Sequence, residues 1–171
     1  MFKLNTIIKT HHLCDLREEL DYFSQIGYKL NLDAVWKWAT IMRVVKSLGL
    51  LERPFRCVDI GGGLSPLHFI FSNYGEVTNV ELTGFKSTWF PTNADGFYLE
   101  SPRIEHNRKN IRYVQDDFIS YAKKIPDNSI DFFYDGCSLI HFNPQKRCSH
   151  NDGVCTAMRE ITRALRGGLF Y

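Results

Sequence analysis

The residues best suited to chemistry stand in the segment "VDIGGGLSPL". Asp59 comes just before the consecutive glycines Gly61, Gly62 and Gly63, and Ser65 follows them. Glycine loses much conformational freedom on folding, so three in a row indicate a hard turn or a ligand that approaches the backbone closely. A helix starting near Ser65 would add free N–H groups and a positive dipole end, which favour a nucleotide or an anion. A tight strand-to-helix turn without a ligand is the simpler alternative.

A second carboxylate follows at the spacing at which dinucleotide-binding folds place the residue that binds a ribose. Glu81 ends the next apolar segment, about 20 residues after Gly61, where a carboxylate binds a ribose hydroxyl pair in dinucleotide-binding folds. A nicotinamide dehydrogenase fits less well, because Pro66 replaces the third glycine of its fingerprint. Asp59 would also repel a pyrophosphate. The pattern favours a ligand that carries a positive charge and no phosphate.

The surrounding elements alternate between short apolar strands and capped helices. Strands are expected at 56–60, 77–82, 111–115 and 130–136, with a fifth beginning at 168, and helices at 15–27, 33–49, 66–75 and 152–168. This alternation predicts an α/β fold with a doubly wound, mostly parallel sheet behind N-terminal helices. Ligands of such sheets bind at the carboxyl ends of the strands, where the glycines lie.

The glycine segment resembles motif I of the class I S-adenosylmethionine-dependent methyltransferases, D/E-x-G-x-G-x-G/S. The match rests on Asp59, Gly61, Gly63 and Ser65. "VTNVEL" is similar to the second motif, which implies that Glu81 binds the ribose of the cofactor S-adenosyl-L-methionine. The resemblance implies the Rossmann-like methyltransferase fold and a methyltransferase activity.

Further motifs extend this resemblance over residues 35–171. "YVQDDF" is similar to the third motif, which implies that Asp117 meets the adenine amino group and Phe118 the adenine face. "SIDFFYDGCSLIHF" resembles the fourth motif, at the methyl-transfer end of the site. There Asp135 is a ligand of the cofactor's amino group or a second candidate base. "AMREITRALRGGLF" is similar to the helix that leads into strand five. His141 is the first candidate for a catalytic residue.

Methyl transfer to a proton-bearing acceptor needs a general base, and the sequence offers one good candidate for it. His141 follows the expected fourth strand, and an unperturbed histidine pKa near ~6.5 suits a general base. A histidine that only caps or hydrogen-bonds a loop explains the residue equally well. Ile140 stands before it where some relatives have glutamate, and the family's usual proline before Gly167 and Gly168 is missing.

Residues 1–50 are expected to form a helical lid or extension, because "WKWATIMRVVKSLGLL" is similar to a lid helix of the family. Residues 51–171 are expected to form the cofactor-binding α/β domain. The family's sheet has seven strands, whereas this sequence ends inside the fifth, so its C-terminal strands are apparently missing. We expect either a fragment or a shortened variant that covers its exposed sheet edge, for example as a homodimer.

The composition limits the kinds of partner that we expect for this protein. The formal net charge is only +2, and "YDGC" lacks the proline pair of enzymes that methylate bases or amides, so a small-molecule acceptor is expected and nucleic acid is not. No apolar stretch is long enough for a membrane helix and no secretory signal is recognisable. Five cysteines without a C-x-x-C pair indicate reduced thiols and a cytoplasmic protein. His141, Cys148, His150 and Cys155 match no common zinc spacing, so no metal is expected.

The aromatic residues of segment 83–110 are expected either to wall the substrate site or to anchor a long loop to the core. The main alternative to an enzyme is a cofactor-binding or interaction module of the same fold that has lost catalysis.

Overall fold

A computed structural model describes residues 15–25, 32–62, 65–82, 108–136 and 152–167 of the chain. The predicted fifth strand, the segment 83–107 and His141 lie outside these residues.

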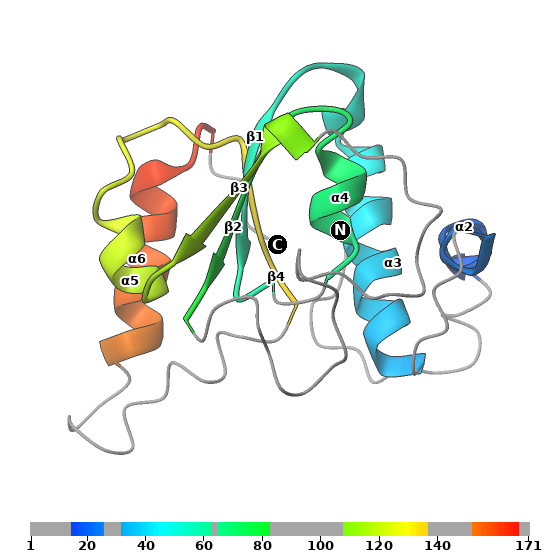
Figure 1. Cartoon of the computed structure of the whole chain (residues 1–171), viewed down its shortest axis with the longest axis horizontal. Helices are drawn as coiled ribbons and strands as arrows, with labels where there is room; N and C mark the ends of the chain where they lie inside the picture. The colour runs from blue at the N-terminus through cyan, green and yellow to red at the C-terminus, as the bar shows by residue number, and fades with distance from the viewer. Residues whose placement is uncertain (1–14, 26–31, 63–64, 83–107, 137–151, 168–171) are drawn as a thin grey trace.

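The described strands form one parallel sheet in the order β3-β2-β1-β4 (Figure 1). The strands are β1 Arg56–Ile60, β2 Glu76–Glu81, β3 Ile111–Gln115 and β4 Phe132–Asp135. The central strand β1 is parallel to β2 on one side and to β4 on the other. This arrangement confirms the predicted doubly wound α/β fold.

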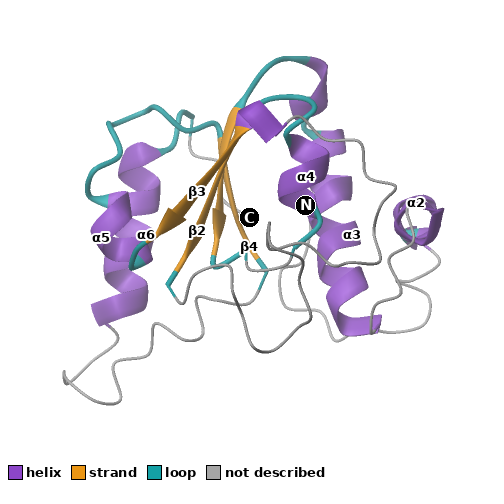
Figure 2. Ribbon diagram, in the orientation of Figure 1, coloured by secondary structure: helices purple, strands orange, loops and turns teal. Residues whose placement is uncertain are grey.

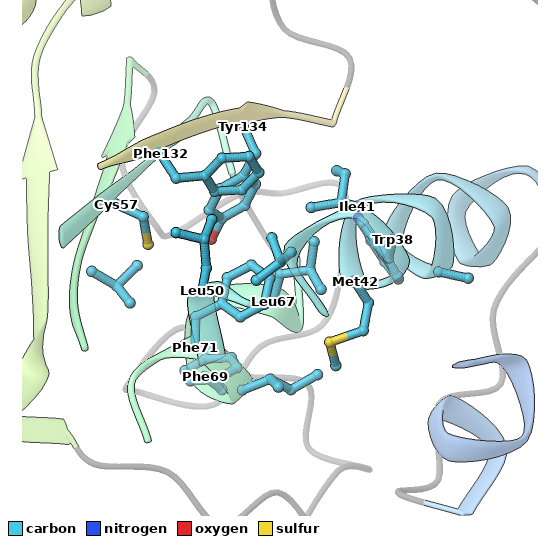
Figure 3. Close-up of a cluster of buried hydrophobic side chains, with 14 of the residues drawn as sticks. Trp38, Ile41, Met42, Leu50, Cys57, Leu67, Phe69, Phe71, Phe132 and Tyr134 are labelled. Carbon is cyan, nitrogen blue, oxygen red and sulfur yellow. The ribbon is translucent and has the colours of Figure 1, made fainter. Parts of the chain in front are cut away.

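One face of the sheet is covered by α3 (Leu32–Ser47) and α4 (Leu67–Phe71). Their side chains share one hydrophobic cluster with the sheet. Figure 3 shows this cluster with Phe132 and Tyr134 of β4, Phe71 of α4 and Trp38 of α3. Helix α3 therefore contributes to the core of the α/β unit. The lid role that the resemblance implies for this region stays a prediction.

The opposite face is covered by α5 (Phe118–Ala122) and α6 (Asp152–Ala164), as Figure 2 shows. Here Val58 and Ile60 of β1 pack with Phe133 of β4 and with Ile161 of α6. Successive residues of a strand point to opposite faces, so β1 supplies Cys57 and Asp59 to the first face and Val58 and Ile60 to this one. Nearly every residue of β1 is buried, as expected for the centre of a parallel sheet.

Helix α2 (Arg17–Gln25) lies outside α3 (Figure 1) and is attached to it by an ion pair. Glu19 of α2 is completely buried and accepts two hydrogen bonds from Arg43 of α3, at 2.9 and 2.6 Å. Lys46 lies 3.4 Å from the same carboxylate and 2.7 Å from Glu18. Burial alone would raise the pKa of Glu19, but the bonds from Arg43 outweigh it and hold this pKa below its ordinary value.

Several element boundaries follow from local chemistry. Gly49 ends the α3 region with φ +65°, a conformation that favours glycine. Ser65 is predicted to cap α4, but Pro66 occupies the N-cap position; the hydroxyl of Ser65 accepts a 3.2 Å hydrogen bond from the N–H of Leu67, the first residue of the helix. A Cβ at Gly75 would lie 2.0 Å from the carbonyl oxygen of Phe55, so only glycine fits before β2.

Other boundaries differ from those predicted, since α4 and α6 end earlier, at Phe71 and Ala164, and β2 begins and ends one residue earlier, at Glu76 and Glu81. Helix α3 begins at Leu32, which places Asp33 inside its first turn and not before it. The short helix α5 is absent from the predicted elements. Among the described residues, no helix is long and apolar enough to cross a membrane.

Candidate functional site

Polar and glycine residues follow the carboxyl ends of all four strands. Gly61 and Gly62 follow β1, Glu81 ends β2, Asp117 comes after β3 and Asp135 ends β4. All five are partly exposed, whereas the strand residues just before Gly61 and Asp135 are buried. The sheet register places Ile60 beside both Val80 and Asp135, so these ends meet at one edge of the sheet. The structure thus places five of the ten site residues predicted from the sequence at this edge, and a sixth, Asp59, directly beneath the glycine turn.

The glycine turn is folded tightly onto Asp59. Gly61 has φ +57°, and its N–H donates a 2.7 Å hydrogen bond to the carbonyl oxygen of Val80. A Cβ at Gly62 would lie 2.1 Å from Oδ2 of Asp59. The backbone at Gly62 therefore covers the carboxylate, and a side chain at this position would force one of the two residues to move.

Asp59 is the most unusual residue of the site. It is 1 % exposed, and neither oxygen of its carboxylate has a hydrogen-bond partner. The hydroxyl of Tyr134 is close enough to interact electrostatically but lies outside hydrogen-bond geometry. Burial raises the pKa of Asp59 well above its ordinary value; the nearby hydroxyl of Tyr134 lowers this pKa in part, and the negative charges of Asp135 and Glu81 raise it.

A polar row crosses the sheet at the level of Asp59. The register pairs Asp59 with Asn79 of β2 and with Tyr134 of β4, and Asn79 with Tyr113 of β3. His68 of α4 covers this row. Its Nδ1 lies 3.2 Å from Nδ2 of Asn79 and 3.6 Å from Oδ2 of Asp59.

Sequence reasoning did not find His68, Asn79 or Tyr134. One signal was present for Asn79, a polar residue between the apolar Val77 and Val80 of a strand expected to be buried. Asn79 is in fact completely buried, and its Oδ1 has no hydrogen-bond partner.

The residues of the third motif have structural roles in this fold. The carboxylate of Asp117 caps α5 by accepting a 2.9 Å hydrogen bond from the N–H of Ser120. Phe118 is buried in the core, where its ring meets Phe133 edge to face at 6.2 Å. Core packing and helix capping account for these two residues. Their contacts with adenine stay predictions.

The remaining predicted site residues divide into two groups. Ser65 is buried beside the glycine turn, and its hydroxyl accepts a hydrogen bond from the N–H of Leu67 at the start of α4. Gly63 and His141 lie outside the described residues. In the described parts of the chain, no group of three or more histidine, cysteine or acidic side chains could hold a metal. Two of the five cysteines, Cys57 and Cys155, fall in these parts and both are free thiols.

Several known structures have a fold similar to that of this chain. No protein-family model and no curated protein matches the chain. Among solved structures, the YcgJ protein of Bacillus subtilis is similar with a TM-score of 0.51 and 22 % identity, over 78 % of this chain and 48 % of that one. A protein of Methanococcus maripaludis, provisionally assigned as an S-adenosyl-L-methionine-dependent methyltransferase, gives 0.52 and 16 %, over 99 % and 66 %.

A third structure was solved with ligands. The 1,6-didemethyltoxoflavin-N1-methyltransferase of Burkholderia thailandensis, with bound 1,6-didemethyltoxoflavin and S-adenosylhomocysteine, gives a TM-score of 0.52 and 18 % identity, over 97 % of this chain and 64 % of that one. The chain thus spans between about half and two thirds of the length of these three structures. With the parallel order β3-β2-β1-β4 and helices on both faces, this likeness shows that the chain has the Rossmann-like α/β fold of the class I S-adenosylmethionine-dependent methyltransferases.

Proposed function

We propose that this protein binds S-adenosyl-L-methionine and transfers its methyl group to a small-molecule acceptor. The observation that carries the proposal is the edge of the sheet where a tight glycine turn lies between the carboxylates of Asp59, Glu81 and Asp135. A likeness in fold does not by itself give an activity, so the argument rests on these residues.

The charges at this edge fit the proposed cofactor. Asp59 is a buried carboxylate without a hydrogen-bond partner, and Glu81 and Asp135 are close enough to raise its pKa. Such an edge favours a ligand with a sulfonium and an ammonium group and disfavours a pyrophosphate. Because a Cβ at Gly62 would meet the carboxylate of Asp59, glycine at this position lets the turn close over Asp59 and holds that carboxylate just beneath the edge.

The bound cofactor would supply the methyl group and its sulfonium leaving group, so the protein's task is mainly to hold donor and acceptor. We assign binding of the ribose hydroxyls to Glu81 and binding of the cofactor's amino group to Asp135. Asp59 is assigned the electrostatic attraction of the cofactor's positive charges. Asp117 and Phe118 are assigned to the adenine, as the sequence resemblance implies.

We assign the removal of the acceptor's proton to His141, which follows β4 in the sequence. With an acceptor in hand, His141→Ala should lower turnover by about 10²–10⁴-fold while cofactor affinity stays nearly unchanged. The same substitution in a histidine that only caps a loop would lower stability and leave the pH profile of turnover as it was.

Calorimetry and thermal unfolding with S-adenosylmethionine, S-adenosylhomocysteine and NAD test the cofactor. The first two ligands should stabilise the folded protein, by about 2.7 kcal/mol at a hundred times their Kd. NAD should not. Binding of NAD without binding of S-adenosylmethionine would overturn the proposal.

Glu81→Gln and Glu81→Ala test the ribose assignment. Charge-assisted hydrogen bonds contribute about 1.5–3 kcal/mol each, so either change should weaken cofactor binding at least tenfold. Asp116→Asn is the matched control, because Asp116 is a neighbouring carboxylate paired with Lys124 at 2.8 Å. Equal affinities in all three variants would remove Glu81 from the site.

A further inference from the structure

His68 and Asp59 form a closed pair beneath the glycine turn. Both residues are 1 % exposed, and Nδ1 of His68 lies 3.6 Å from Oδ2 of Asp59. His68 belongs to α4, the helix that follows the turn, and Asp59 to β1, the strand that precedes it. The pair therefore lies between the two elements that hold the turn.

The charge of this pair has to be small. An ionised carboxylate without a hydrogen-bond partner is very costly to bury, whereas a protonated one, or one paired with an imidazolium, costs far less. Both low-cost arrangements contain one proton shared between Asp59 and His68. Loss of this proton would leave one uncompensated negative charge in the core.

The amide of Asn79 can form a hydrogen bond with His68 whether the shared proton lies on His68 or on Asp59. In the present orientation its Nδ2 faces Nδ1 of His68 at 3.2 Å, which suits an imidazole nitrogen without a proton. A half-turn of the amide would bring the unpartnered Oδ1 to the same place, where it would accept from a protonated Nδ1. The neighbouring amide thus allows the proton to sit on either partner.

We propose that His68 is a positioning residue for the cofactor site, and that it and Asp59 share one proton which leaves when the cationic cofactor binds. On binding, the O–H or N–H bond of the pair breaks, its electron pair stays on the protein, and the proton passes to the solvent. The pair then changes from neutral to one negative charge, which attracts the bound cation. This inference rests on the proposed function for the identity of the cation.

The other ionisable groups around the pair do not supply this charge change. Tyr134 of β4 and Cys57 of β1 are buried and their pKa values are raised by burial, so both stay neutral near pH 7. Tyr113 of β3 meets the ring of His68 edge to face at 5.8 Å. Asp135 and Glu81 stand at the open edge and oppose ionisation of Asp59 until a cation is present.

The shared proton can be tested without any ligand. NMR of protein with ¹³C-labelled aspartate carboxyl groups and ¹⁵N-labelled imidazoles would follow both partners through pH, with Asp59→Asn and His68→Gln identifying the signals. We expect the carboxyl of Asp59 to titrate well above the ordinary aspartate range, and the signal of His68 to respond in the same step. A carboxyl of Asp59 that ionises near pH 4, independently of His68, would overturn the proposal.

The coupling to binding can be tested by calorimetry with S-adenosylmethionine in buffers of different ionisation enthalpy. We expect release of up to about one proton near pH 7, and an affinity that rises by up to about tenfold per pH unit. Asp59→Asn should abolish this release. The difference between the two proteins also corrects for the cofactor's own amino group, whose pKa lies near about 8.

Two further variants complete the experiment. His68→Gln retains a partner for Asn79 but cannot hold a proton, so it should shift the pH range of the coupling. Tyr113→Phe keeps the ring contact with His68 and should bind and release the proton like the wild type. Normal binding with no proton release in the wild type would overturn the coupling. Failure of any binding would instead count against the proposed function, and the ligand-free titration would still decide whether the proton is shared.

Discussion

Asp59 has an environment that stabilises its neutral form. Its carboxylate is enclosed by Gly62, His68 and Tyr134 and receives no hydrogen bond. A residue optimised for stability alone would be apolar or amide-like here. The burial of a carboxylate at the end of β1 is therefore best explained by a task in binding.

The stability of Asp59→Asn tests whether the buried carboxylate lowers the stability of the ligand-free protein. Because the pKa of Asp59 is raised in the folded protein, the folded state holds a proton that the unfolded state loses above about pH 3.8, and stability falls as the pH rises through the raised value. An asparagine resembles the protonated acid and does not ionise. Thermal unfolding without ligand should show Asp59→Asn gaining stability over the wild type from pH 5 to 8. A loss at pH 8 would contradict this explanation.

The sequence predicted part of this site. Asp59, the glycines and Glu81 stand out because they combine unusual residue types with a recognisable spacing. The polar row could not be foreseen, because Asn79 and Tyr134 meet Asp59 only through the register of three strands. Phe118 shows the opposite problem, since a motif position and a core position look the same in a sequence.

At the level of elements, the strands were the easiest to predict. The limits predicted for β1 and β3 agree with the structure, because short β-branched or apolar runs between turn residues leave little choice. Strand β4 begins later than predicted, at Phe132. The side chain of Asp131 instead accepts a 2.9 Å hydrogen bond from the N–H of Arg56, and Ile130 forms an isolated bridge with Leu165. Helix α5, with five residues, is too short to show a helical period.

Arg43 forms the ion pair between α2 and α3, beside the packing of Phe23 against Trp38. Removing one partner of a fully buried ion pair costs about 3–5 kcal/mol, but the side chain of Arg43 is 34 % exposed and water replaces it in part. We therefore expect Arg43→Met to lower the free energy of unfolding by about 1–3 kcal/mol in urea titrations at pH 7. Lys46→Met should cost at most about 1 kcal/mol, because Lys46 pairs mainly with the exposed Glu18.

The effect of Arg43→Met should also depend on pH. The lowered pKa of Glu19 means that its ion pair contributes fully above about pH 4.5 and is lost as the pH falls through the lowered value. The difference between wild type and variant should therefore shrink in acid. A difference that is constant from pH 7 to pH 3 would show that the loss comes from packing alone.

At the scale of the whole molecule, the described residues form two hydrophobic clusters, one on each face of the sheet. Ile70 of α4 belongs to the cluster with α3, and Ile161 of α6 to the cluster with α5. The sheet lies between the two clusters (Figure 1), and no described residue belongs to both of them. Changes in one cluster should be transmitted weakly to the other.

This separation predicts additive stability changes. Ile70→Val and Ile161→Val should each cost about 0.5–1.5 kcal/mol, and the double variant should show their sum within about 0.5 kcal/mol. Denaturant unfolding of the four proteins measures this cycle. Ile60→Val combined with Ile161→Val is the comparison within one cluster, where departures from additivity are expected. A large coupling across the sheet would show that the clusters act as one.

The two strands that flank β1 lie at very different distances from it along the chain. Its partner β2 begins only 20 positions along the chain, since Arg56 pairs with Glu76, but its other partner β4 pairs Cys57 with Phe132. During synthesis the ribosome therefore releases β1, β2 and β3 well before the strand that closes the other side of β1. Until then Asp59 lacks its neighbour Tyr134, and water can reach the carboxylate from that side. We therefore expect the nascent chain to keep this aspartate ionised and hydrated until β4 joins the sheet and completes its enclosure.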